Sequence, residues 1–216
     1  GYVHVGSLRT ALYNYLFARH HNGKLVLRIE DTDQNRYVEG AVENLLTSMD
    51  WCGLEFAEGP TQGGDSGPYY QSQRLDIYKE HIDKLVKTGH AYPCFCSAER
   101  LEKMRETQAA NNIAIKYDGH CRNIPYAEAA ERMKSEEYVM RIKIPTSSET
   151  VVEDIIRGTV RFQNELLDDQ VLVKSDGFPT YHFANVVDDH HMQISHVIRG
   201  EEWLPSTPKH VLIYQA

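Results

Sequence analysis

The chain has 216 residues, of which 41% are hydrophobic and 25% charged, so it can bury a sizeable core and is not disordered overall. Its net charge of −8 argues against non-specific binding to nucleic acid, which needs a basic face, although a local basic patch can still hold a specific RNA. The sequence shows no apolar run near the ~20 residues of a membrane span and no signal peptide, so we expect no membrane contact and a cytoplasmic location.

The first ninety residues alternate between helical and extended patterns. An apolar stripe at helical spacing follows Ser7, a plausible N-cap, and Gly23 stands where a helix-ending glycine belongs. A nearly continuous apolar run over residues 24–29 is typical of a parallel strand that is buried on both faces. Further helices are expected through residues 38–49 and over 72–87. This order predicts an α/β fold in which ligands bind beyond the carboxyl ends of the strands.

From about residue 92 the pattern changes. We expect polar helices over 98–110 and 127–134, and a half-buried strand over 139–144 because apolar and basic residues alternate there. Two short strands follow around a turn at Gly158. This mixed α+β segment interrupts the winding pattern, so we interpret it as an insertion.

The winding pattern resumes near the end of the chain. Residues 171–173 and 194–198 predict strands, and residues 183–187 lie in a predicted helix between them. A last helix is expected from Pro205 onward, since proline suits the first turn of a helix.

Four segments place polar side chains at turns or strand ends. The turn His4-Val5-Gly6-Ser7 feeds a helix N-terminus, whose unpaired N–H groups suit a phosphate. The other segments are residues 28–33, 179–190 and 199–208. In this order the four segments resemble the bacterial glutamyl-tRNA synthetases, a class I aminoacyl-tRNA synthetase family, and the resemblance covers essentially the whole chain.

The resemblance implies that ATP with Mg²⁺ activates L-glutamate to glutamyl-adenylate, and that glutamate then passes to the 3′ end of tRNA-Glu. The family motif assigns ATP binding to His4, Gly6 and Ser7, with His4 and Ser7 also catalytic, and it places Glu202 near the ATP ribose. Ser7 stands where the family has the last histidine of its signature, so a hydroxyl or a backbone N–H would replace an imidazole contact.

The same resemblance implies the residues that bind glutamate. Glu30 would recognise the α-ammonium group, and the planar guanidinium of Arg199 would pair with the side-chain carboxylate and refuse neutral glutamine. Tyr181 and Asn185, four residues apart and therefore on one helical face, would complete the pocket.

Other polar residues carry weaker signals. Asp33 and Arg36 match family positions near the tRNA 3′ end, although charged residues after a strand are usually only solvated. The pair Asp188 and Asp189 is interpreted as structural, because no second carboxylate is tied to it by sequence.

The cysteines predict a structural zinc site apart from the active site. Cys94, Cys96 and Cys121 supply three thiolates, close to a tetrahedral set. The fourth ligand is either Tyr117, as in a Cys-x-Cys…Tyr-x₃-Cys site known in relatives, or His120; three free thiols are the alternative to a metal. The remaining cysteine, Cys52, is expected to be a buried hydrophobe.

The resemblance also implies a domain organisation. A Rossmann-like parallel sheet with helices on both faces would form from residues 1–92 and 174–216, and a zinc-containing domain that binds the acceptor end would occupy 93–173. We expect an N-terminal catalytic fragment without the family's first strand, its lysine-rich KMSKS loop or its anticodon-binding domain. Such a piece should be inactive alone in adenylate formation. A monomer is expected.

Three other functions are weighed against this hypothesis. The relative that glutamylates queuosine in tRNA-Asp shares the cysteine knuckle of residues 92–96 and the segment 117–122, but Asp31-Thr32-Asp33 and Gly200-Glu201-Glu202-Trp203 favour the synthetase. A glutaminyl enzyme is disfavoured by Ile29-Glu30, where that family usually carries Phe-Asp. A non-catalytic zinc-binding RNA module is disfavoured by the acidic balance and the intact pocket segments.

Overall fold

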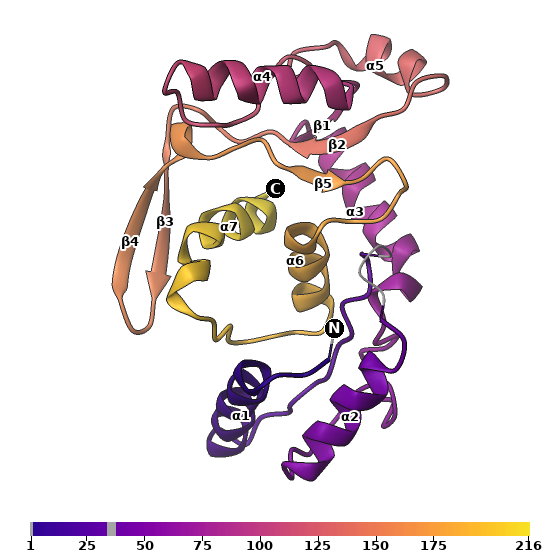
Figure 1. The fold of residues 1–216 in the computed structure, drawn as a ribbon, viewed down its shortest axis with the longest axis vertical. Helices are drawn as coiled ribbons and strands as arrows, with labels where there is room; N and C mark the ends of the chain where they lie inside the picture. Colours follow the sequence, from indigo (N-terminus) through magenta and orange to yellow (C-terminus); the bar gives the residue numbers. More distant parts are fainter. Residues whose placement is uncertain (1, 34–37) are drawn as a thin grey trace. The chain divides into compact units, whose positions relative to one another are not determined.

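The computed structural model describes residues 2–33 and 38–216, and the chain folds as two compact units (Figure 1). Unit 1 comprises Gly1–Leu75 and Asp188–Leu204, and unit 2 comprises Asp76–Val187 and Pro205–Ala216. Each unit is therefore built from stretches that are far apart in the sequence.

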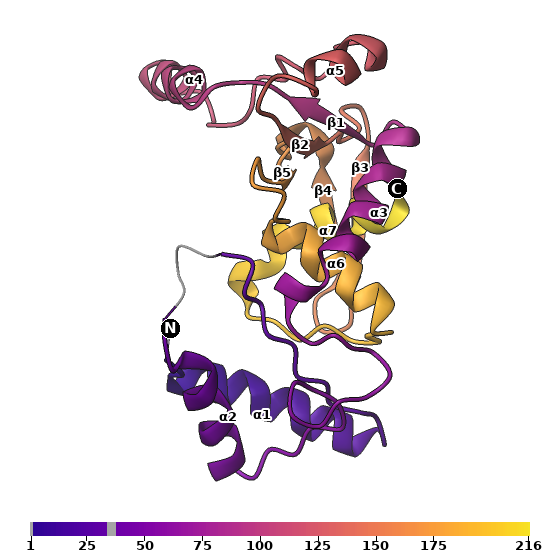
Figure 2. The same ribbon diagram turned by 90° about the vertical axis from the view of Figure 1, so that its right-hand side faces the viewer.

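Unit 1 is built mainly from helices and extended segments. Its elements are α1 (Val5–His20), α2 (Ala41–Trp51), the short 3₁₀ helix η2 (Gln71–Gln73) and most of η4 (Glu201–Ser206). Within this unit α1 and α2 lie side by side, as both views show (Figure 2). The helices predicted near the start of the chain are confirmed.

The N-cap of α1 differs from the prediction. His4, not Ser7, caps the helix, because helical backbone already begins at Val5. The Ser7 N–H donates to the His4 carbonyl at 3.0 Å, so Ser7 lies inside the first turn. The apolar stripe indicated the helix correctly but not its first residue.

The strand predicted over residues 24–29 forms only in part. Val26 and Ile29 make single parallel bridges, to Glu58 and Tyr70 respectively, in place of a regular ladder. The partner segments lie next to Gly-Pro turns and are not extended strands, and proline cannot donate to a ladder. The named strands whose pairing is described are all antiparallel, so the expected parallel sheet is not seen in the described residues.

Unit 2 contains two antiparallel sheets. Three strands pair in the order β1 (Ala91–Cys94), β2 (Val139–Ile142) and β5 (Val171–Val173). The hairpin of β3 (Glu149–Asp154) and β4 (Gly158–Gln163) confirms the two short strands expected around Gly158.

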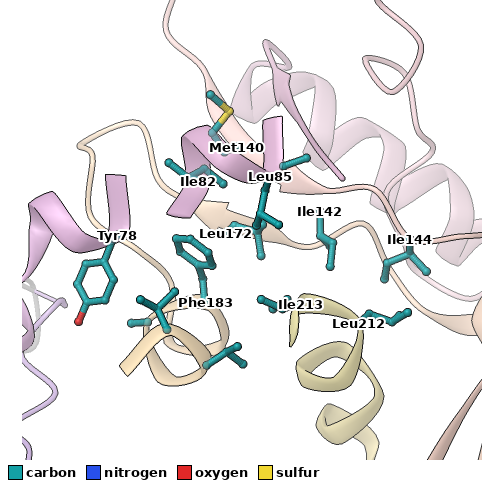
Figure 3. Packing of buried hydrophobic residues seen from close by; sticks show 14 residues of the cluster. Tyr78, Ile82, Leu85, Met140, Ile142, Ile144, Leu172, Phe183, Leu212 and Ile213 are labelled. Atoms are coloured by element: carbon teal, nitrogen blue, oxygen red, sulfur yellow. The ribbon is translucent and has the colours of Figure 1, made fainter. Parts of the chain in front are cut away.

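Helices of unit 2 surround the three-stranded sheet (Figure 1). They are α3 (Leu75–Lys87), α4 (Ala98–Ala110), α5 (Tyr126–Arg132), η3 (Asn164–Leu166), α6 (Tyr181–His191) and α7 (Thr207–Gln215), with the last turn of α6 belonging to unit 1. Helix α7 also packs against β3 of the hairpin. The core of unit 2 lies where α3, α6 and α7 meet the three-stranded sheet (Figure 3). Ile82, Leu172, Phe183 and Ile213 are among its buried side chains. Each predicted helix of this unit is thus confirmed to within a few residues at its ends.

Two further expectations, a strand over residues 194–198 and a buried Cys52, differ from the structure. No strand is assigned over residues 194–198, a stretch whose side chains are mostly exposed. Cys52 is exposed, not buried, because it follows the last turn of α2, where the neighbouring Trp51 is 85% exposed as well. Within the described part of the chain, no helix has the length and apolar character needed to cross a membrane.

Candidate active site and metal cluster

The N-terminus of α1 presents His4 in a defined orientation. Its ring Nδ1 accepts the backbone N–H of Gly6 at 3.1 Å. In the neutral imidazole this leaves the proton on Nε2, so the exposed edge of the ring is a hydrogen-bond donor. No acidic residue lies in the first turn of α1, so nothing there opposes an anion at this positive helix end.

Gly6 has a role that the sequence did not reveal. A Cβ at this position would lie 2.9 Å from His4 Cε1, which is closer than real Cβ contacts allow. Glycine is therefore required so that the His4 ring can fold back over the helix start. The Ser7 N–H is used by the helix, which leaves its hydroxyl as the group available to a ligand.

Arg28 is the centre of an ion-pair network in unit 1. Its Nη1 lies 2.9 Å from Asp189 Oδ1, and its Nη2 lies 3.4 Å from Glu30 Oε1. Its Nε lies 3.6 Å from an oxygen of Asp188. Sequence analysis did not assign Arg28 a role, although a charged residue inside an otherwise apolar run was the available signal.

Asp188 anchors this network from a fully buried position. Arg74 Nε donates to Asp188 Oδ1 at 2.7 Å, and Gln71 Nε2 donates to Oδ2 at 2.9 Å. Arg74 in turn donates to the carbonyl of Pro68 at 2.9 Å, so it also fixes the preceding loop. These contacts agree with the structural role expected for Asp188, and Arg74 is a further residue that the sequence reasoning missed.

Glu30 lies at the edge of the network with 39% of its side chain exposed. Desolvation by the atoms around it raises the pKa of its carboxyl, and the charge of Arg28 opposes this increase. The charge of Arg199 has a smaller effect in the same direction as that of Arg28 on the pKa of Glu30 and of Asp189. The neighbouring Asp31 has a separate task, because it accepts both the N–H and the hydroxyl of Ser72.

The other predicted ligands fall into smaller groups. Tyr181 and Asn185 lie together on α6, where the Asn185 amide donates to the Tyr181 hydroxyl at 3.3 Å. Glu202 is exposed on η4 with its carboxylate over Gly200, where a Cβ would overlap it. Asp33 is exposed, and the prediction for Arg36 falls outside the described residues.

Three cysteines of unit 2 form a cluster that could hold a metal. The sulfurs of Cys94, Cys96 and Cys121 all lie within 4.8 Å of one another. The Cys96 and Cys121 sulfurs are 3.7 Å apart, and a tetrahedral zinc bound at about 2.3 Å from each sulfur sets this edge at about 3.8 Å. The spacing therefore fits the prediction that these three thiols share one ion.

Tyr117 adds an oxygen to the cluster. Its hydroxyl lies 3.3 Å from Cys94 Sγ and 3.5 Å from Cys96 Sγ, and it accepts the Cys121 N–H at 2.9 Å. The alternative, His120, is exposed and is not part of the group of clustered ligand atoms. Of the two residues left open by the sequence, Tyr117 has the better geometry.

Burial controls the acidity of the cluster in the metal-free protein. Burial and the neighbouring thiols raise the pKa of Cys96 to about 12, and burial with hydrogen bonding to the thiols raises the pKa of Tyr117. Burial alone would also raise the pKa of Cys94, but hydrogen bonds from Tyr117, the Cys96 backbone and Arg141 together lower it. A cation that binds the thiolates would remove this cost of ionisation.

The family of the chain follows from its sequence and fold taken together. The model of the catalytic domain of "tRNA synthetases class I (E and Q)" matches residues 1–216. The chain belongs to this catalytic-domain family of class I tRNA synthetases.

Individual relatives narrow the comparison. The chain is 59% identical over 223 residues to the glutamate–tRNA ligase of Alkaliphilus metalliredigens and 56% identical over 216 residues to that of Dehalococcoides mccartyi. The alignments cover 100% of this chain and 45% and 43% of those ligases.

A solved structure shows the same fold. The glutamate–tRNA ligase of Elizabethkingia meningosepticum, described in complex with its amino acid, matches with a TM-score of 0.93 and 45% identity, over 100% of this chain and 44% of that one. The fold is thus that of a class I synthetase catalytic domain. The chain spans less than half the length of the curated relatives it matches.

Proposed function

We propose that the chain is the catalytic part of a glutamate–tRNA ligase. The enzyme activates L-glutamate with ATP and Mg²⁺ and transfers it to the 3′ end of tRNA-Glu, with tRNA-Gln as a second acceptor to be tested. The observation that carries this proposal is the place of Glu30 after the apolar run of residues 24–29, where Arg28 holds its partly exposed carboxylate at 3.4 Å, an acid suited to an ammonium group. The identity to glutamate–tRNA ligases supports it.

The glutamate pocket is assigned to four residues. Glu30 binds the α-ammonium group, and Arg199 pairs bidentately with the γ-carboxylate, which neutral glutamine cannot match. Tyr181 and Asn185 contribute polar groups from α6, where they already share a hydrogen bond. That these two pairs of residues serve one pocket is part of the proposal.

Adenylate formation needs the glutamate carboxylate in line with the α-phosphorus of ATP. The enzyme forms no covalent intermediate, so its task is to position the reactants and stabilise phosphate charge. His4 is assigned the catalytic donor role through Nε2–H, and Gly6 and the Ser7 hydroxyl line the same helix start. Glu202 is assigned to the ATP ribose.

The same proposal includes the domain organisation, the contacts with the tRNA 3′ end, and the location and oligomeric state of the enzyme. The sheet of residues 1–92 and 174–216 is Rossmann-like, and residues 93–173 form an inserted domain for the tRNA acceptor end. Asp33 and Arg36 approach the tRNA 3′ end. The enzyme is a cytoplasmic monomer, located where its tRNA substrate is used.

We assign zinc to the cluster, with Cys94, Cys96, Cys121 and Tyr117 as ligands. Support comes from the spacing, because zinc with a bound oxygen at about 2.0 Å sets sulfur–oxygen edges of about 3.5 Å, and the Tyr117 hydroxyl lies 3.3 and 3.5 Å from the sulfurs of Cys94 and Cys96. The zinc would be structural and would take no part in the reaction.

A binding experiment tests the function without relying on turnover. Titration calorimetry of the intact enzyme with a non-hydrolysable glutamyl-adenylate analogue should show tight, saturable binding, and the matched glutaminyl analogue should bind at least about 100-fold more weakly. Equal binding of the two analogues would contradict the assigned role of Arg199. An absence of binding to both would favour a non-catalytic RNA module.

A further inference from the structure

Arg141 is a buried arginine beside the three-cysteine cluster. It lies on β2, where the pairing with β5 shifts register, and it is only 6% exposed. The alternation of apolar and basic residues in 139–144 predicted basic side chains on a solvent face, which is wrong for Arg141. A register shift re-aims side chains, which accounts for the difference. A guanidinium keeps its charge when buried, so this residue needs compensation.

The partners of Arg141 do not include a carboxylate within ion-pair distance among the described residues. Its Nη1 donates to the carbonyl of Asp169 at 2.9 Å, and its Nε is buried without a hydrogen-bond partner. The Asp169 carboxylate is engaged elsewhere, because it accepts from Tyr92 at 2.7 Å and from Arg122 at 2.5 Å. A neutral carbonyl does not offset a buried positive charge, and the groups that favour the charged form of Arg141 are Cys94 and Tyr117 of the cluster, with a smaller effect of Asp168.

The remaining contact of Arg141 is with Tyr117, whose hydroxyl lies among the three sulfurs of the cluster. Its guanidinium carbon lies 3.9 Å from the centroid of the Tyr117 ring, and its charge acts on Cys94. Asp168 holds the other side of Tyr117, since its carboxylate accepts the Tyr117 N–H at 2.9 Å. The ring whose oxygen lies among the sulfurs is therefore fixed by stacking and by a backbone anchor.

We propose that Arg141 is an outer-shell positioning residue of the metal centre, which offsets its negative charge and holds the Tyr117 ring in the ligating orientation. The inference rests on the zinc centre of the proposed function. Three thiolates around Zn²⁺ leave a net charge of −1, and an ionised Tyr117 makes it −2, so one buried cation is the matching partner. Outer-shell partners of this kind typically change metal affinity by 10- to 100-fold.

Arg132 offers a matched control on the same cluster. Its guanidinium carbon lies 4.1 Å from the centroid of the Phe95 ring, between the two cysteines of the knuckle. Unlike Arg141, it pairs through two hydrogen bonds of 2.8 Å with the partly exposed Glu136. It thus has similar stacking geometry but an independent partner for its charge.

The test measures the affinity of the intact enzyme for Zn²⁺ itself, by competition with a chromogenic chelator. Wild type, Arg141→Met, Arg141→Lys and Arg132→Met are compared, and circular dichroism of each metal-free protein reports folding. We expect about 10- to 100-fold weaker zinc binding for Arg141→Met and an unchanged affinity for Arg132→Met. Arg141→Lys should lie between wild type and Arg141→Met, because lysine keeps the charge but not the planar stacking group.

Cobalt substitution separates positioning from general destabilisation. A tyrosine oxygen and three sulfurs give Co²⁺ a characteristic absorption spectrum, and loss of the Tyr117 orientation should make the Arg141→Lys spectrum resemble that of Tyr117→Phe. Zinc affinity within twofold of wild type in both Arg141 variants would overturn the inference and leave the ligase proposal standing. If the wild type itself binds no zinc, both the zinc assignment and the proposed role of Arg141 are wrong. Aminoacylation by the wild type is measured separately. Its absence would overturn the proposed ligase function, whatever the zinc affinities of the Arg141 variants.

Discussion

Arg28 and Asp189 form a 2.9 Å ion pair that joins the end of an extended segment to the last turn of α6. The second arm of the same guanidinium lies beside Glu30, so the residue proposed to bind the substrate ammonium is held by a structural cation. This contact restrains the partly exposed Glu30 side chain before any ligand binds. Such preorganisation lowers the entropy cost of binding.

Replacement of Glu30 tests the ammonium site. In Glu30→Gln the neutral amide cannot compensate the substrate charge, so we expect the KM for glutamate to rise about 10- to 100-fold, the value of one charge-assisted hydrogen bond. Steady-state aminoacylation measures it. The exposed Glu55, 3.7 Å from Arg19, provides the control Glu55→Gln, which should behave as wild type. An unchanged KM in Glu30→Gln would remove Glu30 from the pocket.

The pH dependence of glutamate binding follows from the same residue. Desolvation raises the pKa of Glu30, and only the ionised form attracts the ammonium group. Binding should therefore be complete above the raised pKa and be lost as the pH falls through it, at a higher pH than for an ordinary carboxyl. KM measured from neutral pH downward should show this acid limb in the wild type. Its persistence in Glu30→Gln would assign the limb to another group.

Arg199 is expected to determine the choice of amino acid. Arg199→Met removes the group that distinguishes a carboxylate from an amide, so the preference for glutamate over glutamine in kcat/KM should fall by about 100-fold or more. Arg199→Lys should be intermediate, because it keeps the charge without the planar fork. Competition between the two labelled amino acids measures the ratio. A wild-type ratio in Arg199→Met would contradict the assignment.

Asp188 is expected to carry stability. Asp188→Asn leaves Arg74 and Arg28 without a buried anion, and breaking a buried pair costs about 3–5 kcal/mol in the free energy of unfolding. Denaturant titration measures the change. Glu131→Gln disrupts the exposed pair with Lys134 and should cost at most about 0.5 kcal/mol. Similar losses in both variants would argue against a special role for the buried network.

Gly6 is expected to act through His4. In Gly6→Ala the new methyl group displaces the His4 ring, so kcat should fall while the melting temperature changes little. The control is Gly23→Ala at the other end of α1, where the nearest atom would lie at an ordinary 3.6 Å. A normal kcat in Gly6→Ala would mean that the ring orientation does not matter for catalysis.

The sequence predicted helices better than strands, for a physical reason. The stripe of α1 and the polar α4 carry their own periodicity, and α4 spans the expected residues 98–110. The apolar run of residues 24–29 indicates only a preference for extended backbone, because a ladder also depends on partners distant in sequence. Those partners turned out to be irregular segments near Glu58 and Tyr70.

At the candidate site, too, the sequence suggested one kind of residue and missed another. Motifs suggested the residues that we propose touch substrate, such as Glu30 and His4, because such motifs recur in a family. The supporting residues Arg28, Arg74 and Arg141 were not assigned, since nothing local distinguishes a buried arginine from an exposed one. The burial of Arg74 and Arg141 and the partial burial of Arg28 became visible only when the fold brought Asp188 and the cysteine cluster beside them.

Aminoacylation tests the central claim most directly. The intact enzyme is given labelled glutamate, ATP and Mg²⁺, with purified tRNA-Glu, tRNA-Gln and tRNA-Asp offered separately. We predict labelling of tRNA-Glu, and the tRNA-Gln sample will show whether discrimination is strict. Labelling of tRNA-Asp alone would contradict the account and indicate an enzyme that glutamylates queuosine.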